Sequence, residues 1–172
     1  MRKSNIDNLW SLGFMRICMA NFLLFASLYM LFPVLPAVMV LRLGVSTAQM
    51  GSMFLVFAVG MFLVGPFHAY LGDAYKRKHV LVYSTFIMLA ATVGYLFADT
   101  FTKLLLLAVV QGGTFGLAAT AGITVAIDIT NSPRRSAGNM TYALAARLGM
   151  LVGVGVGVWM FQLKGFSMVV YL

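Results

Sequence analysis

The chain has 172 residues, of which 62% are hydrophobic and 9% charged, and its formal net charge is +8. A soluble domain is roughly half apolar and about a quarter charged, and a chain this small has too little interior to hide so much apolar surface. These values exclude an ordinary soluble domain. The positive charges form short clusters between long apolar runs, a pattern typical of membrane helix ends rather than of a nucleic-acid-binding surface.

Five apolar runs are long enough to cross a bilayer, which takes about 20 residues. In chain order they cover residues 17–41, 48–71, 80–98, 104–127 and 140–161. The first is too long for a signal peptide and is followed by no small-residue cleavage site. Residues 165–172 predict the start of a sixth helix that the chain does not complete. We therefore expect one all-α, polytopic transmembrane bundle over residues 1–172, incomplete and without a soluble domain.

The basic residues predict the orientation of this bundle. With the amino terminus in the cytoplasm, the outside receives only Arg42, Lys103 and Lys164. The inside then receives Arg2, Lys3, Arg16, Lys76, Arg77, Lys78, Arg134 and Arg135. Because cytoplasmic loops are enriched in lysine and arginine, we predict a cytoplasmic amino terminus.

Glycine recurs at every fourth position on two of the expected helices. Gly149, Gly153 and Gly157 form a stripe on the fifth, and Gly112 and Gly116 form a shorter one on the fourth. Such a stripe lets a neighbouring helix backbone approach closely. The spacing indicates helix packing, and it leaves open that the same contact serves as a sliding surface in a moving protein.

Polar residues inside the apolar runs are candidates for lining a solute cavity, although each can instead form hydrogen bonds between helices. They include Asn21, Gln111, Thr114 and Tyr142. Arg147 lies roughly 9–14 Å into the fifth helix at a rise of about 1.5 Å per residue. A charge at that depth normally faces a bundle interior or a water-filled cavity, unless its long side chain bends back to the interface. We favour the cavity, with Arg147 contacting either an anionic or polar solute or an acidic residue of the missing half.

The sequence shows no pattern of an enzyme or a metal protein. His68 and His79 have no acidic or cysteine neighbours at metal-ligand spacing, and the single cysteine, Cys18, lies in an apolar run. Neither a nucleophile with its base nor a phosphate-binding glycine-lysine loop is present. We therefore expect no catalytic activity, no metal site and no cofactor.

The segment Ala69–Leu81 resembles the signature of the major facilitator superfamily, G-x-L-a-D-r-x-G-R-R/K-x-x-l, which also lies between the second and third helices of that family. The matching residues are Leu71, Gly72, Asp73, Arg77, Lys78 and Leu81. The segments Asn21–Phe25 and Pro33–Pro36 resemble the first helix of bacterial sugar-efflux and drug-efflux members.

Two further likenesses to this family are partial. Gln111-Gly112 is similar to an R-x-x-Q-G pattern in the fourth helix, with Ala108 in place of the arginine. The glycine stripe of the fifth helix is similar to the antiporter pattern G-x-x-x-G-P-x-x-G-G, with Val154 and Val158 in place of its proline and last glycine.

The resemblance implies the amino-terminal half of a twelve-helix secondary transporter in a bacterial inner membrane. Such a protein moves a small solute by alternating access, with efflux as one direction and a proton as a coupling ion, and its partner is the carboxy-terminal half. The resemblance also implies that Asp73, Arg77 and Asp128, beside Lys78, form a cytoplasmic charge cluster that latches the outward-facing state. The alternative is separately solvated charges. A small helical scaffold or assembly protein and a membrane-embedded enzyme are the other function classes.

Overall fold

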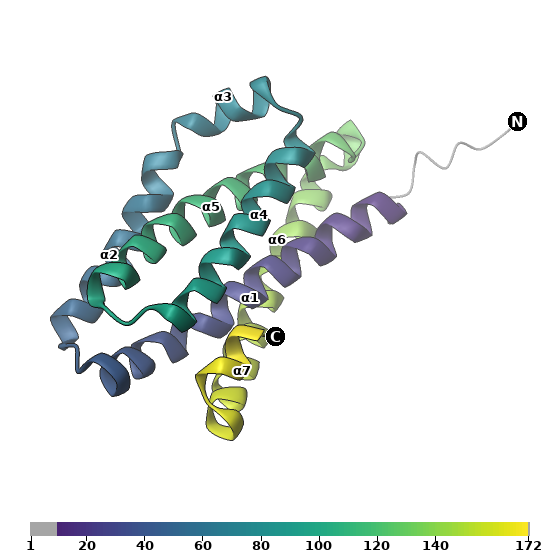
Figure 1. Cartoon of the computed structure of the whole chain (residues 1–172). Coiled ribbons are helices and arrows are strands. Elements are labelled where there is room, and N and C mark those ends of the chain that lie inside the picture. The colour runs from purple at the N-terminus through teal and green to yellow at the C-terminus, as the bar shows by residue number, and fades with distance from the viewer. Residues whose placement is uncertain (1–9, 172) are drawn as a thin grey trace, which may run out of the picture.

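The computed structural model describes residues 10–171, except for the side chains of His68, Ala69, Gly72, Asp73, Lys164, Ser167, Met168 and Tyr171. Within these residues the chain is an all-α bundle (Figure 1). Five of the described helical segments are long and apolar enough to cross a membrane. The predicted fold class and the predicted number of complete spans are therefore confirmed.

The helices follow one another through short connections. The long ones are α1 (Leu12–Leu43), α2 (Thr47–Val64), α4 (Arg77–Gly94), α5 (Phe101–Asp128) and α6 (Arg135–Lys164). The short helix α3 (Phe67–Ala74) follows α2, the 3₁₀ turn η2 (Tyr95–Phe97) extends α4, and η3 (Ser132–Arg134) leads into α6. The last element is α7 (Phe166–Tyr171), which turns back along the bundle from the end of α6 (Figure 1).

Local signals explain where several helices start and stop. The hydroxyl oxygens of Ser11, Ser46 and Thr100 accept hydrogen bonds from backbone N–H groups in the first turns of α1, α2 and α5. These caps satisfy donors that a helix start otherwise leaves without partners. Gly44 ends α1 at φ 61°, a left-handed conformation that favours glycine.

The second expected helix, residues 48–71, is broken in the structure. It divides into α2 and α3 at Gly65-Pro66, because proline has no backbone N–H to continue the helical hydrogen bonds. Two other helices begin about five residues earlier than expected, α1 at Leu12 and α6 at Arg135. Hydropathy marks only the apolar part of a helix, whereas its capped and charged first turns extend beyond that part.

The glycine stripe of α6 lies directly on α1. A Cβ atom added to Gly149, Gly153 or Gly157 would collide with backbone atoms of Phe22, Ala26 or Met30 respectively. The two sets of residues each advance by four, so one face of α6 follows one face of α1 over two turns. No larger side chain fits in this contact without moving one helix away from the other.

A similar contact joins α2 and α5. A Cβ atom on Gly112 would meet the backbone of Phe57, and one on Gly116 would meet Met61. From the other side, Gly60 of α2 lies against the backbone of Val109. Helix α5 also packs along α4, so it forms the middle of the bundle.

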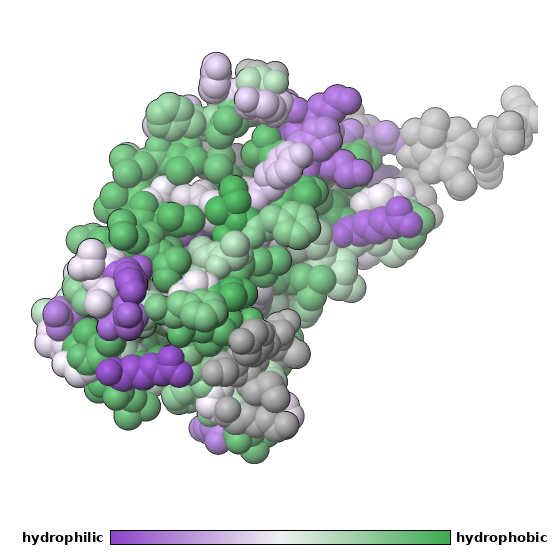
Figure 2. Space-filling view, in the orientation of Figure 1, coloured by the Kyte–Doolittle hydropathy of each residue, from purple (hydrophilic) through white to green (hydrophobic). Residues whose placement is uncertain are grey.

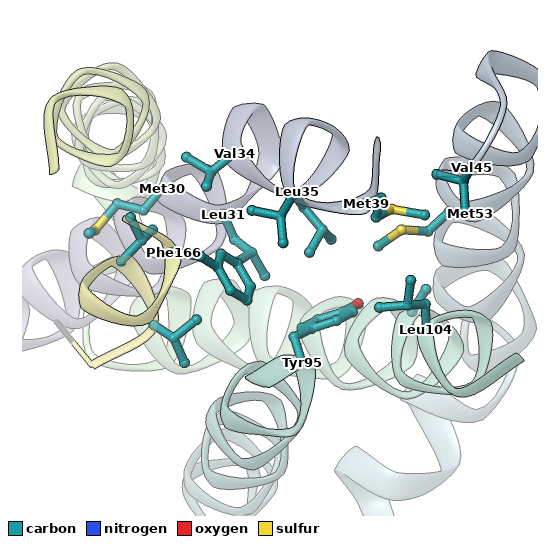
Figure 3. Close-up of a cluster of buried hydrophobic side chains, with 14 residues drawn as sticks. Met30, Leu31, Val34, Leu35, Met39, Val45, Met53, Tyr95, Leu104 and Phe166 are labelled. Carbon is teal, nitrogen blue, oxygen red and sulfur yellow. The ribbon is translucent and has the colours of Figure 1, made fainter. Parts of the chain in front are cut away.

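Buried apolar side chains join the helices at the end of the bundle where α1 and α6 finish. This cluster brings together residues of α1, α2, α5 and α7 around Tyr95 (Figure 3). Phe166, the first residue of α7, projects into it toward Leu31 (Figure 3). The guanidinium of Arg42 lies over the ring of Phe166, 5.4 Å from its centroid, and adds a cation–π contact.

We expect substitution of a stripe glycine to weaken the α1–α6 contact. Gly153→Ala places a methyl group against the backbone of Ala26 and should lower the free energy of unfolding by roughly 1–3 kcal/mol. Gly155→Ala is the matched control, because a Cβ atom there meets nothing within 4 Å. Thermal unfolding in detergent measures both, and an equal effect of the two substitutions would contradict the packing account.

Candidate functional site

The most clearly defined charged contact joins α4 to α5. Nη1 of Arg77 donates to both carboxylate oxygens of Asp128, at 2.7 and 2.8 Å. Both side chains remain about half exposed, at 42% and 49%. An ion pair of this exposure contributes at most about 1 kcal/mol, so it is strong enough to bias an equilibrium and weak enough to break.

The structure brings two of the four residues of the expected charge cluster together. Arg77 is the first residue of α4 and Asp128 the last of α5, and a hollow of about 530 Å³ lies beside the pair. Lys76 and Lys78 also line this hollow. The side chain of Asp73 lies outside the described residues, so the contact expected for it stays a prediction.

Charge is unequal between the two ends of the bundle. We call the end where α1 and α6 begin and α5 finishes the basic end, because its exposed side chains include Arg16, Lys76, Lys78, Arg134 and Arg135. At the opposite end, Lys103 pairs with Asp99, and the hydrogen bond from Lys103 keeps the pKa of the Asp99 carboxyl below its ordinary value. Hydrophilic side chains gather toward the two ends, and apolar ones cover the middle (Figure 2).

Two of the polar residues predicted to line a cavity do lie together at one. Asn21 is 3% exposed, and its Nδ2 donates to the backbone oxygen of Tyr142 at 2.9 Å. The Oδ1 atom of Asn21 has no hydrogen-bond partner among the residues described. Both residues line a cavity of about 670 Å³ between α1, α4 and α6, whose other walls are mainly apolar.

Gln111 and Thr114 form hydrogen bonds within the bundle and do not line that cavity. The hydroxyl of Tyr95 donates to Gln111 Oε1 at 3.0 Å, and Gln111 Nε2 donates to Thr92 Oγ1 at 3.1 Å. Thr114 Oγ1 donates to the backbone oxygen of Val110 at 2.7 Å. The contacts of Gln111 hold α4, η2 and α5 together, which is the interhelical role left open by the sequence.

Arg147 is exposed on α6, twelve residues after Arg135 and therefore about 18 Å along the helix axis. It forms no ion pair with any described residue. Val156, which lines the cavity, lies nine residues further on, or about two and a half helical turns. Arg147 therefore points to the opposite side of α6, away from this cavity and onto an open face of the bundle.

The structure contains a cluster of aromatic rings that the sequence analysis did not predict. With 14 phenylalanines in the chain, the sequence does not show which of them pack together. Ring centroids 5.1–6.5 Å apart connect three rings of α1, two of α2 and one of α5. The rings belong to Phe25, Tyr29, Phe32, Phe54, Phe57 and Phe115. The spacing of the three α1 rings, at four and then three residues, is the signal that places them on one helix face.

The described side chains contain no group of three or more histidine, cysteine or acidic residues that could hold a metal ion. The candidate site therefore consists of an exposed ion pair at the basic end, a mainly apolar cavity and an arginine on an open helix face. The cavity and the arginine can bind a ligand, and the ion pair can form or break when helices move. None of these features supplies an activated nucleophile.

Comparison with known proteins relates this chain to a family and to an individual protein. The family model described as Major Facilitator Superfamily matches residues 17–172. The chain is also similar to the quinolone resistance protein NorA of Staphylococcus aureus (strain MRSA252), with 25% identity over 144 residues. This alignment covers 83% of the chain and 37% of NorA, so the chain spans well under half the length of this relative.

We expect the hydrogen bonds of Gln111 to stabilise the bundle. Tyr95→Phe removes the donor to Gln111 Oε1 and leaves a buried acceptor without a partner, which should cost about 1–3 kcal/mol of unfolding free energy. Tyr83→Phe on α4, the helix that η2 extends, is the control, since Tyr83 is 66% exposed. Chemical unfolding in detergent compares them, and equal stability of the two variants would argue against the buried hydrogen bond.

Proposed function

The chain belongs to the Major Facilitator Superfamily, and we propose that it is the amino-terminal part of a secondary transporter that moves a small solute by alternating access. The observation that carries the proposal is the family match over residues 17–172 together with five helices able to span a membrane. In such transporters the solute binds near the bilayer midplane, between two repeats that move against each other.

The remainder of the transporter is the proposed partner of this bundle. The alignment covers 37% of NorA, which leaves sequence for a second, carboxy-terminal bundle. Because that relative is a quinolone resistance protein, we propose export as the direction of transport. The proposed coupling ion is a proton, as the family resemblance of the sequence implies. The proposed location is a bacterial inner membrane, with the basic end in the cytoplasm.

We propose that the Arg77–Asp128 pair belongs to a latch at the cytoplasmic side, together with Asp73 and Lys78. The pair connects the start of α4 to the end of α5, so it forms or breaks as these two helix ends move relative to each other. A contact that is present in one state and absent in the other shifts the population by its own free energy. At about 1 kcal/mol this shift is roughly fivefold, which suits a latch that opens in every transport cycle.

We propose Arg147 as the solute-contacting charge of this half. Its position roughly 9–14 Å inside the membrane and its exposed side chain support that role, because a charge at such depth normally faces water or a charged partner. The planar guanidinium binds carboxylate or phosphate oxygens through two parallel hydrogen bonds. The half-buried rings on α1 and α2 could add stacking contacts for an aromatic solute.

The orientation is tested by cysteine labelling in intact cells, in a variant whose Cys18 is replaced by alanine. Cysteines at Lys78 and Arg134 should react only with membrane-permeant reagents, because the basic residues lie in the cytoplasm. Cysteines at Arg42 and Lys103 should react with impermeant reagents added outside. The reversed labelling pattern would overturn the proposed orientation.

The latch is tested by a charge exchange in the intact transporter. Arg77→Asp or Asp128→Arg alone should reduce transport about fivefold or more, since each places like charges together. The double variant should recover part of that loss. Asp99→Asn, which breaks an exposed ion pair at the opposite end, is the matched control and should transport normally. Undiminished transport by both single variants would remove the latch role.

Arg147 is tested by paired substitutions at normal expression. Arg147→Ala should nearly abolish transport, and Arg147→Lys should weaken it, because lysine keeps the charge but loses the planar fork. Arg135→Ala, in the first turn of the same helix, controls for loss of a positive charge on α6. If Arg147→Ala transports at the normal rate, the residue is an interfacial anchor and not a solute contact.

A further inference from the structure

The sequence provides no acidic partner for Arg147 inside the membrane. Arg147 is the only lysine, arginine, aspartate or glutamate in the five apolar runs. All four acidic residues of the chain, Asp7, Asp73, Asp99 and Asp128, lie outside those runs. Asp99 and Asp128 already form ion pairs at the two ends of the bundle. Because a charge within a membrane normally pairs with another charge or faces water, we expect Arg147 to meet a negative group from outside the chain.

The aromatic cluster begins a short distance along the bundle from Arg147. The glycine stripe of α6 meets α1 in ascending order, so these two helices run parallel, and Gly149 lies against Phe22. Arg147 precedes Gly149 by two residues, and Phe25 follows Phe22 by three. At about 1.5 Å per residue, Phe25 lies about 8 Å and Tyr29 about 14 Å farther along the bundle axis than Arg147. A small solute is long enough to reach from the guanidinium to the first of these rings.

The rings of α1 and Arg147 lie on the same side of the α1–α6 contact. Phe25 and Tyr29 each come one residue before a residue that contacts the glycine stripe. Ser27 comes one residue after such a residue, and it lines the apolar groove that is the cavity between α1, α4 and α6. Each residue turns a helix by about 100°, so the rings and the groove lie on opposite sides of the contact. Because Arg147 also points away from the groove, it shares the open face with the rings.

Arg147 restricts the kind of aromatic solute that this face can take. An aromatic ring stacks on a planar solute and also attracts cations, so the rings alone leave the charge of the solute open. The guanidinium of Arg147 repels a cation and binds a carboxylate through two parallel hydrogen bonds. One guanidinium balances the single charge of a carboxylate, whereas a phosphate monoester carries a charge nearly twice as large. The combination therefore favours a carboxylate.

We propose that the solute of this transporter is an aromatic carboxylate, whose carboxylate binds Arg147 and whose ring stacks on Phe25 and Tyr29. The inference rests on the proposed function, in which Arg147 contacts the solute. Both rings are half-buried, so each keeps part of its surface open to a ligand while its packing holds it in place. A fixed ring and a fixed charge about 8 Å apart along the axis select a solute by its shape as well as by its charge.

The test measures how tightly the intact transporter in detergent binds four matched probes, using titration calorimetry. The probes are naphthoate, the neutral naphthamide, the cation naphthylmethylammonium and the saturated acid decahydronaphthoate. Naphthoate should bind about tenfold or more tightly than the amide or the cation, because only its carboxylate forms charged hydrogen bonds with Arg147. It should bind roughly three- to tenfold more tightly than the saturated acid, which has no aromatic face.

Two substitutions assign these preferences to residues. Arg147→Gln should abolish the preference for naphthoate over naphthamide and leave naphthamide binding unchanged. Phe25→Leu should reduce the preference for naphthoate over decahydronaphthoate and leave binding of the saturated acid unchanged. Binding of the unaffected probe shows that each variant is folded. Arg135→Gln, in the first turn of α6, and Tyr83→Leu, a 66% exposed ring outside the cluster, are the matched controls and should keep both preferences.

The outcomes separate this inference from the proposed function. Absence of naphthoate binding, equal binding of the acid, the amide and the cation, or tighter binding of the cation would overturn the solute class even if the protein transports other solutes. Loss of transport in Arg147→Gln with the charge preference intact would also overturn it, and would pair Arg147 with an acidic residue of the missing half. Both preferences in a protein that shows no solute flux would support the binding face and contradict the transporter.

Discussion

The backbone contact between α6 and α1 is the constraint on which the rest of the structure depends. In lipid the apolar side chains of two helices gain little by meeting, so helix association depends on close packing and interhelical hydrogen bonds. Gly149, Gly153 and Gly157 provide that packing by letting α6 lie on the backbone of α1. The same approach brings Asn21 within 2.9 Å of the backbone oxygen of Tyr142, adding a buried hydrogen bond.

The pairing of α1 with α6 also decides which surfaces remain open. With the stripe directed at α1, Arg147 lies on a different face of α6, and Val156 lines the groove on the other side. The α2–α5 contact repeats the arrangement through Gly60 and Gly112. Two surfaces therefore remain open once these glycine contacts have formed. One is the face of α6 that carries Arg147, and the other is the apolar groove, which no charged residue lines.

Losing a polar interaction costs more free energy in the middle of this bundle than at its ends. The hydrogen bonds of Gln111 are buried, so losing one partner leaves an unsatisfied group in a medium without water. The Arg77–Asp128 pair is half exposed, and water can replace either partner at little cost. The buried hydrogen bonds therefore hold the helices in one arrangement, while the pair at the basic end can form and break between conformations.

The sequence by itself determined the class of the protein, its number of spans and its family. Bilayer thickness sets the length of an apolar run, and the four-residue spacing of Gly149, Gly153 and Gly157 is visible without coordinates. The signature around Arg77 and Lys78 likewise pointed to the major facilitator superfamily, to which the chain belongs. Each of these properties belongs to a single segment of the chain, so the sequence alone is enough to identify it.

Only the tertiary structure decided which segments meet. That Gln111 binds Tyr95 and Thr92, that Asp128 binds Arg77 and that six rings gather on α1, α2 and α5 all depend on how helices face one another. A periodic pattern shows that a helix has a packing face and does not identify its neighbour. The groove between α1, α4 and α6 has the same origin, because it is the space that three helices leave between them once their backbone contacts have fixed their positions.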